Sequence, residues 1–183
     1  MHRFFLPGYW DGKPINMNIE ETYLEAEADI KNNAYVDAYR KYESILYEEP
    51  NYAPAHNSMG WLLKNQFDDM EKAENHFLAA IKSNPLYPHP HFHYAVLLTD
   101  MERYRELENH LEKCLKLATI EKSWVHARRG IVKELQLRFE EAIGNYETAI
   151  LATLSDDKIR EYKADIERCK LKLELQKSRG QNP

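Results

Sequence analysis

Residues 53–87 read APAHNSMGWLLKNQFDDMEKAENHFLAAIKSNPLY, and this stretch decides the fold. It holds two runs of helix-favouring residues separated by a short polar break, and it closes on Pro85, which cannot continue a helix. Gly60 lies in the first run and Ala73 in the second, so both runs carry a small residue. The stretch therefore predicts two helices that pack closely against each other.

The same pattern returns along the chain with a period of 34 or 35 residues. His56, His91 and His126 each stand four residues before a small residue and follow one another in steps of 35. Thr22 occupies the equivalent position in an earlier block, 34 residues before His56. A period held over four blocks indicates a repeat protein. The expected helix pairs are 19–31 with 35–48, 53–65 with 69–83, 88–100 with 103–117, and 122–135 with 139–153.

Small and large residues alternate in a fixed order within each block. The first helices carry Ala26, Gly60, Ala95 and Gly130, and the second helices carry Ala38, Ala73, Leu107 and Ala142. A larger residue follows four positions later in each second helix: Tyr42, Phe77, Leu111 and Tyr146. We expect the small residues to let the two helices meet and the larger residue to wedge against the next block. Because no block buries its apolar face alone, the stack of blocks forms the core.

These positions resemble the tetratricopeptide (TPR) repeat family, whose signature runs over 34 residues. The second block matches best, with Met59, Gly60, Leu63, Ala73, Phe77 and Pro85, and the first block matches from Ala38 to Pro50. The third and fourth blocks have Thr119 and Leu154 in place of the closing proline, and the second block has one extra residue in its inner turn. The resemblance implies an all-α fold, a right-handed solenoid of about four antiparallel helix pairs. The implied repeats are 19–52, 53–87, 88–121 and 122–156.

A C-terminal capping helix is expected over residues 157–178. Apolar residues spaced by three or four positions form one stripe on it: Ile159, Tyr162, Ile166, Cys169 and Leu173. Such a helix covers the exposed end of a solenoid. The alternative is a dimerisation helix.

Residues 1–18 do not fit the repeats. They contain the aromatic residues Phe4, Phe5, Tyr9 and Trp10. We expect an extended N-terminal arm that packs on the first helices, with an arm that reaches another subunit or a partner as the alternative.

Charge and composition exclude several classes of function. The 25 basic and 30 acidic residues give a net charge of −5, which disfavours general nucleic-acid binding. Cys114 and Cys169 have neither metal-site spacing nor a disulfide pattern. The chain shows no signal-peptide core and no membrane span, so we expect a cytoplasmic protein with no membrane partner.

The resemblance places the first helix of each pair on the concave side, where it lines a groove for a partner peptide or helix. The implied groove residues are Tyr23, Glu27, Asn57, Ser58, Trp61, Phe92, His93, Val96, Trp124, Arg128 and Ile131, with His89 nearby. Trp61, Phe92 and Trp124 would supply affinity, and Asn57 and Arg128 would orient the bound segment. The alternative is that several of these residues only touch the N-terminal arm or the C-terminal helix.

One TPR subfamily grips the C-terminal carboxylate of heat-shock chaperones with two Lys, two Asn and an Arg at set groove positions. Those positions hold other residues in the first three blocks: Tyr23, Glu27, Ser58, His89 and His93. A chaperone-tail clamp is therefore not expected. Arg128-Arg129 is a candidate site for phosphate or an acidic partner, or alternatively an ion pair at the groove edge.

No enzyme activity, metal or cofactor is expected. Among His89, His91 and His93, the pair His89 and His93 lies one helical turn apart and suggests a metal site. His91 shares its repeat position with His56 and His126, which favours a packing role. No phosphate loop or catalytic motif is present in the sequence. The expected function is a protein–protein interaction module, an adaptor or scaffold. The alternative is a structural subunit that self-associates through the N-terminal arm or the C-terminal helix.

Overall fold

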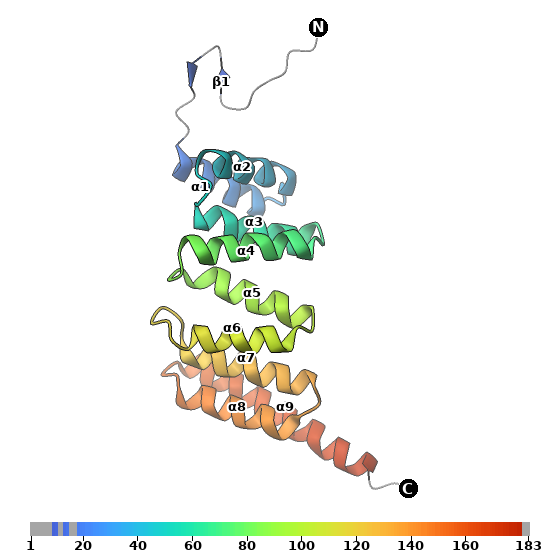
Figure 1. Cartoon of the computed structure of the whole chain (residues 1–183). Helices are drawn as coiled ribbons and strands as arrows, with labels where there is room; N and C mark the ends of the chain where they lie inside the picture. Colours follow the sequence, from blue (N-terminus) through green and yellow to red (C-terminus); the bar gives the residue numbers. More distant parts are fainter. Residues whose placement is uncertain (1–8, 11–12, 15–17, 181–183) are drawn as a thin grey trace. The chain divides into compact units, whose positions relative to one another are not determined.

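A computed structural model describes residues 9–10, 13–14 and 18–180 of the 183-residue chain (Figure 1). Apart from one short strand pair, all regular structure in these residues is helical. The elements are β1 (Tyr9–Trp10), β2 (Lys13–Pro14), α1 (Ile19–Lys31), α2 (Tyr35–Glu48), α3 (Ala53–Gln66), α4 (Met70–Ser83), α5 (Pro88–Asp100), α6 (Tyr104–Cys114), α7 (Lys122–Leu135), α8 (Phe139–Leu151) and α9 (Asp156–Gly180). The helices match the expected ranges closely, except that α6 ends at Cys114, three residues earlier than predicted.

The inner turn of every block has the same backbone geometry. One residue in each turn has a positive φ, with values of 61°, 53°, 55° and 58° for Asn33, Asp68, Glu102 and Leu137. These four residues are 34 or 35 positions apart, so the period of the sequence is also a period of the backbone. A left-handed residue at this place ends a helix and reverses the chain.

Backbone hydrogen bonds in these turns confirm the extra residue of the second block. In the first block Ala34 N–H donates to the Asp29 carbonyl, five residues back, at 2.8 Å. The third and fourth blocks form the same five-residue bond. In the second block Asp69 N–H reaches the Leu63 carbonyl, six residues back, at 3.0 Å.

The small residues allow the close helix contact that the sequence predicted, but the large residues act partly inside their own block. A Cβ added to Gly60 would lie 2.6 Å from Phe77 Cε1, and one added to Gly130 would lie 2.8 Å from Tyr146 Cε1. Phe77 and Tyr146 therefore fill the space above the glycine of the same helix pair. Phe77 also stacks on His93 of the following block. The sequence predicted that these large residues pack only against the next block. That prediction was incomplete, because the absence of a side chain on the glycine leaves room for the ring within the same block.

The chain divides into two compact units, residues 1–97 and 98–183, and the division crosses α5. In the first unit, α1 packs on α2, α2 on α3, and α3 on α4. In the second unit, α6 packs on α7, α7 on α8, and α8 on α9. Each unit is thus a succession of helices packed on their sequence neighbours; Figure 1 labels these helices.

Helix α9 packs on α8 through the predicted apolar stripe. Tyr162, Ile166 and Cys169 are buried in one cluster with Tyr146 and Ala149 of α8. Arg168 and Lys172 of the same helix pair with Glu134, at the C-terminal end of α7. This packing agrees with a capping helix. The stripe is occupied within the chain, so these side chains are not a free surface for dimerisation.

Most of the N-terminal arm, including Phe4 and Phe5, lies outside the described residues. Within the described part, β1 and β2 pair antiparallel, with Tyr9 opposite Pro14 and Trp10 opposite Lys13. Among the helices that the structure describes, none combines the length and the apolar character needed to cross a membrane.

Candidate functional site

A pocket in the first unit brings together five of the residues that the sequence placed in a groove. It encloses about 230 Å³ and is lined by Glu27, Ile30, Tyr42, Asn57, Ser58, Trp61 and His93. The lining comes from α1, α2, α3 and α5. Ile30 and Tyr42 were not predicted, because their place in the pocket depends on how α1 and α2 pack.

A hydrogen-bond network centred on Glu27 holds three helices together at this pocket. Tyr42 Oη and Ser58 Oγ both donate to Glu27 Oε1, each at 2.7 Å. Since the single Ser58 hydroxyl proton is used in that bond, Tyr23 Oη must donate to Ser58 Oγ, at 3.1 Å. Two hydroxyl protons are therefore donated to one carboxylate oxygen, and the third, from Tyr23, is donated to Ser58 Oγ.

The tyrosines of this network remain protonated donors at neutral pH. Burial raises the pKa of Tyr23 and of Tyr42, and the nearby negative charge of Glu27 raises both further. The hydrogen bond from Tyr42 to Glu27 adds to the rise in the Tyr42 pKa. The Glu27 carboxylate is thus the acceptor toward which the network converges.

Asn57 lines the pocket, and its side-chain acceptor has no hydrogen-bond partner among the described residues. The residue is only 7% exposed, and its Oδ1 is buried without a hydrogen-bond partner among the described residues. Leaving a buried acceptor unsatisfied costs about 1–3 kcal/mol. A ligand that donates a hydrogen bond to Oδ1 would remove this cost.

His93 forms a neutral wall of the pocket. Its ring stacks on Phe77, with ring centroids 5.6 Å apart and an interplanar angle of 19°. Burial lowers the pKa of His93, and the charges of His89 and Lys64 lower it further. With His93 neutral at pH 7, Glu27 is the one formal charge among the residues lining this pocket.

The other predicted groove residues of the first unit lie around the pocket rather than in its lining. Tyr23 contacts the rings of Tyr42 and Tyr52, at centroid distances of 6.1 and 5.8 Å. Phe92 lies edge-on to His89 at 6.3 Å. Val96 is half-buried on α5.

The remaining predicted groove residues lie on α7, in the second unit. The Arg128 guanidinium lies 5.9 Å from the Trp124 ring centroid, and Arg128 Nε is buried without a hydrogen-bond partner among the described residues. Burial lowers the pKa of Arg128, which is still a cation at neutral pH. Ile131 is half-buried and packs against the cluster that contains Tyr146 and Tyr162.

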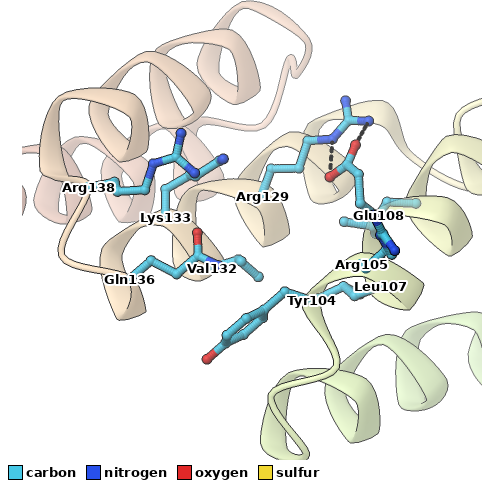
Figure 2. Close-up of a pocket in the computed structure, with 10 residues that line it drawn as sticks. Tyr104, Arg105, Leu107, Glu108, Arg129, Val132, Lys133, Gln136 and Arg138 are labelled. Atoms are coloured by element: carbon cyan, nitrogen blue, oxygen red, sulfur yellow. Dashed lines mark hydrogen bonds and ion pairs between the residues drawn. The ribbon is translucent and has the colours of Figure 1, made fainter.

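A second pocket, between α6 and α7, was not predicted (Figure 2). It encloses about 350 Å³ and is lined by Tyr104, Arg105, Leu107, Glu108, Leu111, Arg129, Val132, Lys133, Gln136 and Arg138. Arg129 forms ion pairs with Glu108 and Glu112, and its Nε donates to Glu108 Oε2 at 3.2 Å. This agrees with the ion-pair interpretation of Arg129. Nothing in the repeat pattern marks the pocket, because its residues come from different positions of two repeats.

The histidines of the third block face different partners. His91 Nε2 donates to the Pro85 carbonyl at 3.0 Å, and His56 Nε2 makes the same 3.0 Å bond to the Pro50 carbonyl one repeat earlier. These equivalent bonds confirm a structural role for both histidines. His93 instead stacks on Phe77.

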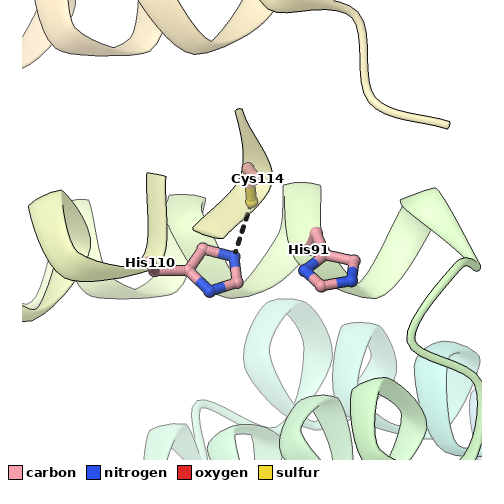
Figure 3. Close-up of side chains that lie close together, drawn as sticks. All are labelled: His91, His110 and Cys114. Atoms are coloured by element: carbon pink, nitrogen blue, oxygen red, sulfur yellow. Dashed lines mark hydrogen bonds between the residues drawn. The ribbon is translucent and has the colours of Figure 1, made fainter. Parts of the chain in front are cut away.

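Cys114 is a buried thiol on α6. Its Sγ lies 3.5 Å from His110 Nε2, one turn earlier on the same helix (Figure 3). Burial raises the pKa of Cys114 to about 11, so the thiol is protonated at neutral pH. This microenvironment is that of a structural cysteine rather than a reactive one.

Comparisons with known proteins identify the fold. No family model and no curated protein sequence matches the chain at a significant level. Among solved structures, the chain is similar to the TPR protein TTC0263 of Thermus thermophilus, at 16% identity over 82% of each chain, with a TM-score of 0.64. It is also similar to residues 41 to the end of MamA from Desulfovibrio magneticus RS-1, at 16% identity over 90% of this chain and 97% of that one, with a TM-score of 0.64.

Human IFIT1, in a dimer with m7Gppp-AAAA, gives a TM-score of 0.76 at 18% identity over 87% of this chain. The chain spans 40% of the IFIT1 chain. The likeness to TTC0263, MamA and IFIT1 shows that the chain has a tetratricopeptide-type fold of antiparallel helix pairs. At sequence identities of 16–18%, similarity to these structures establishes the fold but does not identify a ligand.

Proposed function

We propose that this protein is a protein-interaction module, and that the pocket on the first helices of its first unit holds part of a partner protein. One observation carries the proposal: Asn57, whose Oδ1 is buried and has no hydrogen-bond partner among the described residues, lines the same pocket as Trp61 and Glu27. An aromatic side chain beside an unused hydrogen-bonding group is the arrangement that anchors peptides at interfaces.

A protein partner is favoured over a nucleic acid by charge. Between residues 18 and 97 the chain has thirteen acidic and six basic side chains, a net charge of −7. Between residues 98 and 180 it has sixteen acidic and seventeen basic side chains, a net charge of +1. The unit that carries the pocket would repel a phosphate backbone. The ligand of IFIT1 is therefore not transferred to this site.

To test this proposal, peptides that bind the purified protein are selected from a random-sequence display library. Dissociation constants of the selected peptides are then measured for wild type, Trp61→Ala and Tyr47→Ala. Tyr47 is an aromatic residue of α2 that is 68% exposed and does not line the pocket. We expect Trp61→Ala to weaken binding at least about tenfold, as loss of an interface anchor does, and Tyr47→Ala to leave it unchanged. Equal effects of the two substitutions would show that the pocket is not the binding site.

A further inference from the structure

The pocket at Glu27 presents acceptors to a ligand and has already used its hydroxyl donors. The hydroxyl protons of Tyr42 and Ser58 are donated to Glu27 Oε1. A carboxylate offers about four lone-pair sites, so Glu27 retains acceptor capacity after these two bonds. Asn57 Oδ1 adds a second acceptor, buried and without a partner among the described residues.

Charge points to the same kind of ligand. Neighbouring acids of α1, Glu25 and Asp29, are both paired with Lys41, at 3.2 and 2.8 Å. Among the described residues Glu27 has hydroxyl partners and no ion pair, so its charge is not neutralised by a cation of the protein. A basic ligand would also be drawn by the net charge of −7 over residues 18–97.

The volume of the pocket and its aromatic lining narrow the choice of ligand further. A volume of about 230 Å³ is below the range of about 300–1,000 Å³ typical of small-molecule pockets, so it suits a single side chain. Trp61 and Tyr42 line it, and aromatic faces attract Lys and Arg side chains. The long aliphatic stem of either residue would also cover Ile30.

We propose that the pocket lined by Glu27, Asn57 and Trp61 accepts a lysine or arginine side chain of the partner, an inference that rests on the proposed function. The cationic group donates to the Glu27 carboxylate and to Asn57 Oδ1, and its stem packs against Trp61. An acidic side chain would be repelled by the negative charge of Glu27. A purely apolar one would bury Glu27 and leave Asn57 Oδ1 unsatisfied.

The experiment uses four small probes on the full chain: the Nα-acetyl, N-methylamide derivatives of lysine, arginine, norleucine and glutamate. Each is titrated while the side-chain NMR signals of Asn57 and Trp61 are followed. We expect lysine and arginine to shift both signals with affinities at least about tenfold above norleucine, the neutral analogue of lysine, and glutamate to produce no shift. Equal affinity for lysine and norleucine, a preference for glutamate, or no shift with any probe would overturn the proposal.

Two charge-removing variants distinguish a direct contact with Glu27 from a general effect of the negative net charge of the first unit. Glu27→Gln keeps an acceptor for Tyr42 and Ser58 but removes the charge, and we expect it to abolish the preference for lysine over norleucine. Glu43→Gln removes the same charge from an exposed position of α2 outside the pocket, and we expect the preference to persist. Asn57→Asp should raise the affinity for lysine. The same loss of preference in both glutamate variants, or weaker lysine binding by Asn57→Asp, would contradict the contact.

Failure of this inference is distinguishable from failure of the proposed function. If display-selected peptides depend on Trp61 but carry no excess of basic residues, the pocket binds protein segments and the basic-residue inference is wrong. If no selected peptide depends on Trp61, the proposed function itself is wrong.

Discussion

The Phe77 ring lies against Gly60 so closely that a Cβ on Gly60 would come within 2.6 Å of Phe77 Cε1. Gly60 is buried and Phe77 is fully buried. The contact joins the first and second helices of the second block, next to the helix face that carries Asn57 and Trp61.

Gly60→Ala should therefore destabilise the protein. Overpacking costs about 1–3 kcal/mol, and the better helix propensity of alanine returns about 1 kcal/mol, so we expect a net loss of up to about 2 kcal/mol. Gly144→Ala is the matched control, since nothing lies within 4 Å of a Cβ at Gly144 in α8. That change should stabilise by about 0.5–1 kcal/mol in urea unfolding. Stabilisation by both substitutions would show that the ring can move.

The ion pair between Glu134 and Arg168 should stabilise the folded protein at pH values above about 4.5. Arg168 donates to Glu134 at 2.7 and 2.6 Å, and this contact is the main reason that the Glu134 pKa falls from 4.5 to about 2. Because the folded-state pKa is depressed, the stabilisation is complete above about pH 4.5 and is lost as pH falls toward 2. Allowing for Arg168 being 46% exposed, we expect about 2 kcal/mol.

Glu134→Gln should remove that acid dependence when unfolding free energy is measured across this pH range. Glu140→Gln is the control, because Glu140 is 72% exposed and pairs with Lys177 at the surface. The control should change stability by less than about 1 kcal/mol. A pH profile of Glu134→Gln that matches wild type would refute the assigned role of this pair.

His76 should titrate far below an ordinary histidine. His56 Nε2–H is donated to the Pro50 carbonyl, so His56 Nδ1 accepts the proton of His76 Nδ1, at 3.0 Å. Burial, and then the neighbouring His56, lowers the pKa of His76 from 6.5 to about 4. Its contribution to stability is present above pH 6.5 and is lost as pH falls toward 4. An NMR titration of the His76 ring should show its midpoint near pH 4, and a midpoint near 6.5 would contradict this environment.

Leu137 is the least suited of the four left-handed turn residues. Its φ is 58° and its side chain is 63% exposed, so it gains little from packing in return for the strain. Leu137→Gly should stabilise the protein by about 0.5–1 kcal/mol in thermal or urea unfolding. Asn33→Gly should not stabilise, because asparagine tolerates this geometry and Asn33 Oδ1 accepts a 2.6 Å hydrogen bond from Tyr35. Equal gains at both positions would indicate that the strain at Leu137 is negligible.

The helices and the repeat could be predicted because small residues, prolines and histidines return at a fixed spacing. His56 and His91 illustrate this, since the same residue type makes the same bond to the Pro50 and Pro85 carbonyls. The left-handed turns could not be found in this way, since Asn33, Asp68, Glu102 and Leu137 are four different residue types. Their geometry follows from closing the helix pair and not from the residue type.

Part of the candidate site was predictable and part was not. Glu27, Asn57 and Trp61 follow from their positions on the first helices, as the family resemblance implied. The direction of the Tyr23, Ser58 and Glu27 hydrogen bonds was not predictable, because it depends on which buried hydroxyl protons are already used. The packing of Ile131 against the cluster that includes Tyr162 was not predictable either, because the position of a residue on a helix does not reveal a covering helix from elsewhere in the chain.

The most direct measurement of the central claim, that the pocket beside Asn57 is where a partner binds, is site-specific photo-crosslinking. Asn65→p-benzoylphenylalanine places a photoreactive group on exposed α3 one turn from Trp61 and outside the pocket lining, and Tyr47→p-benzoylphenylalanine places it on exposed α2. With display-selected peptides, we predict crosslinking from position 65 and none from position 47. Crosslinking from position 47 alone, or equally from both positions, would contradict the claim.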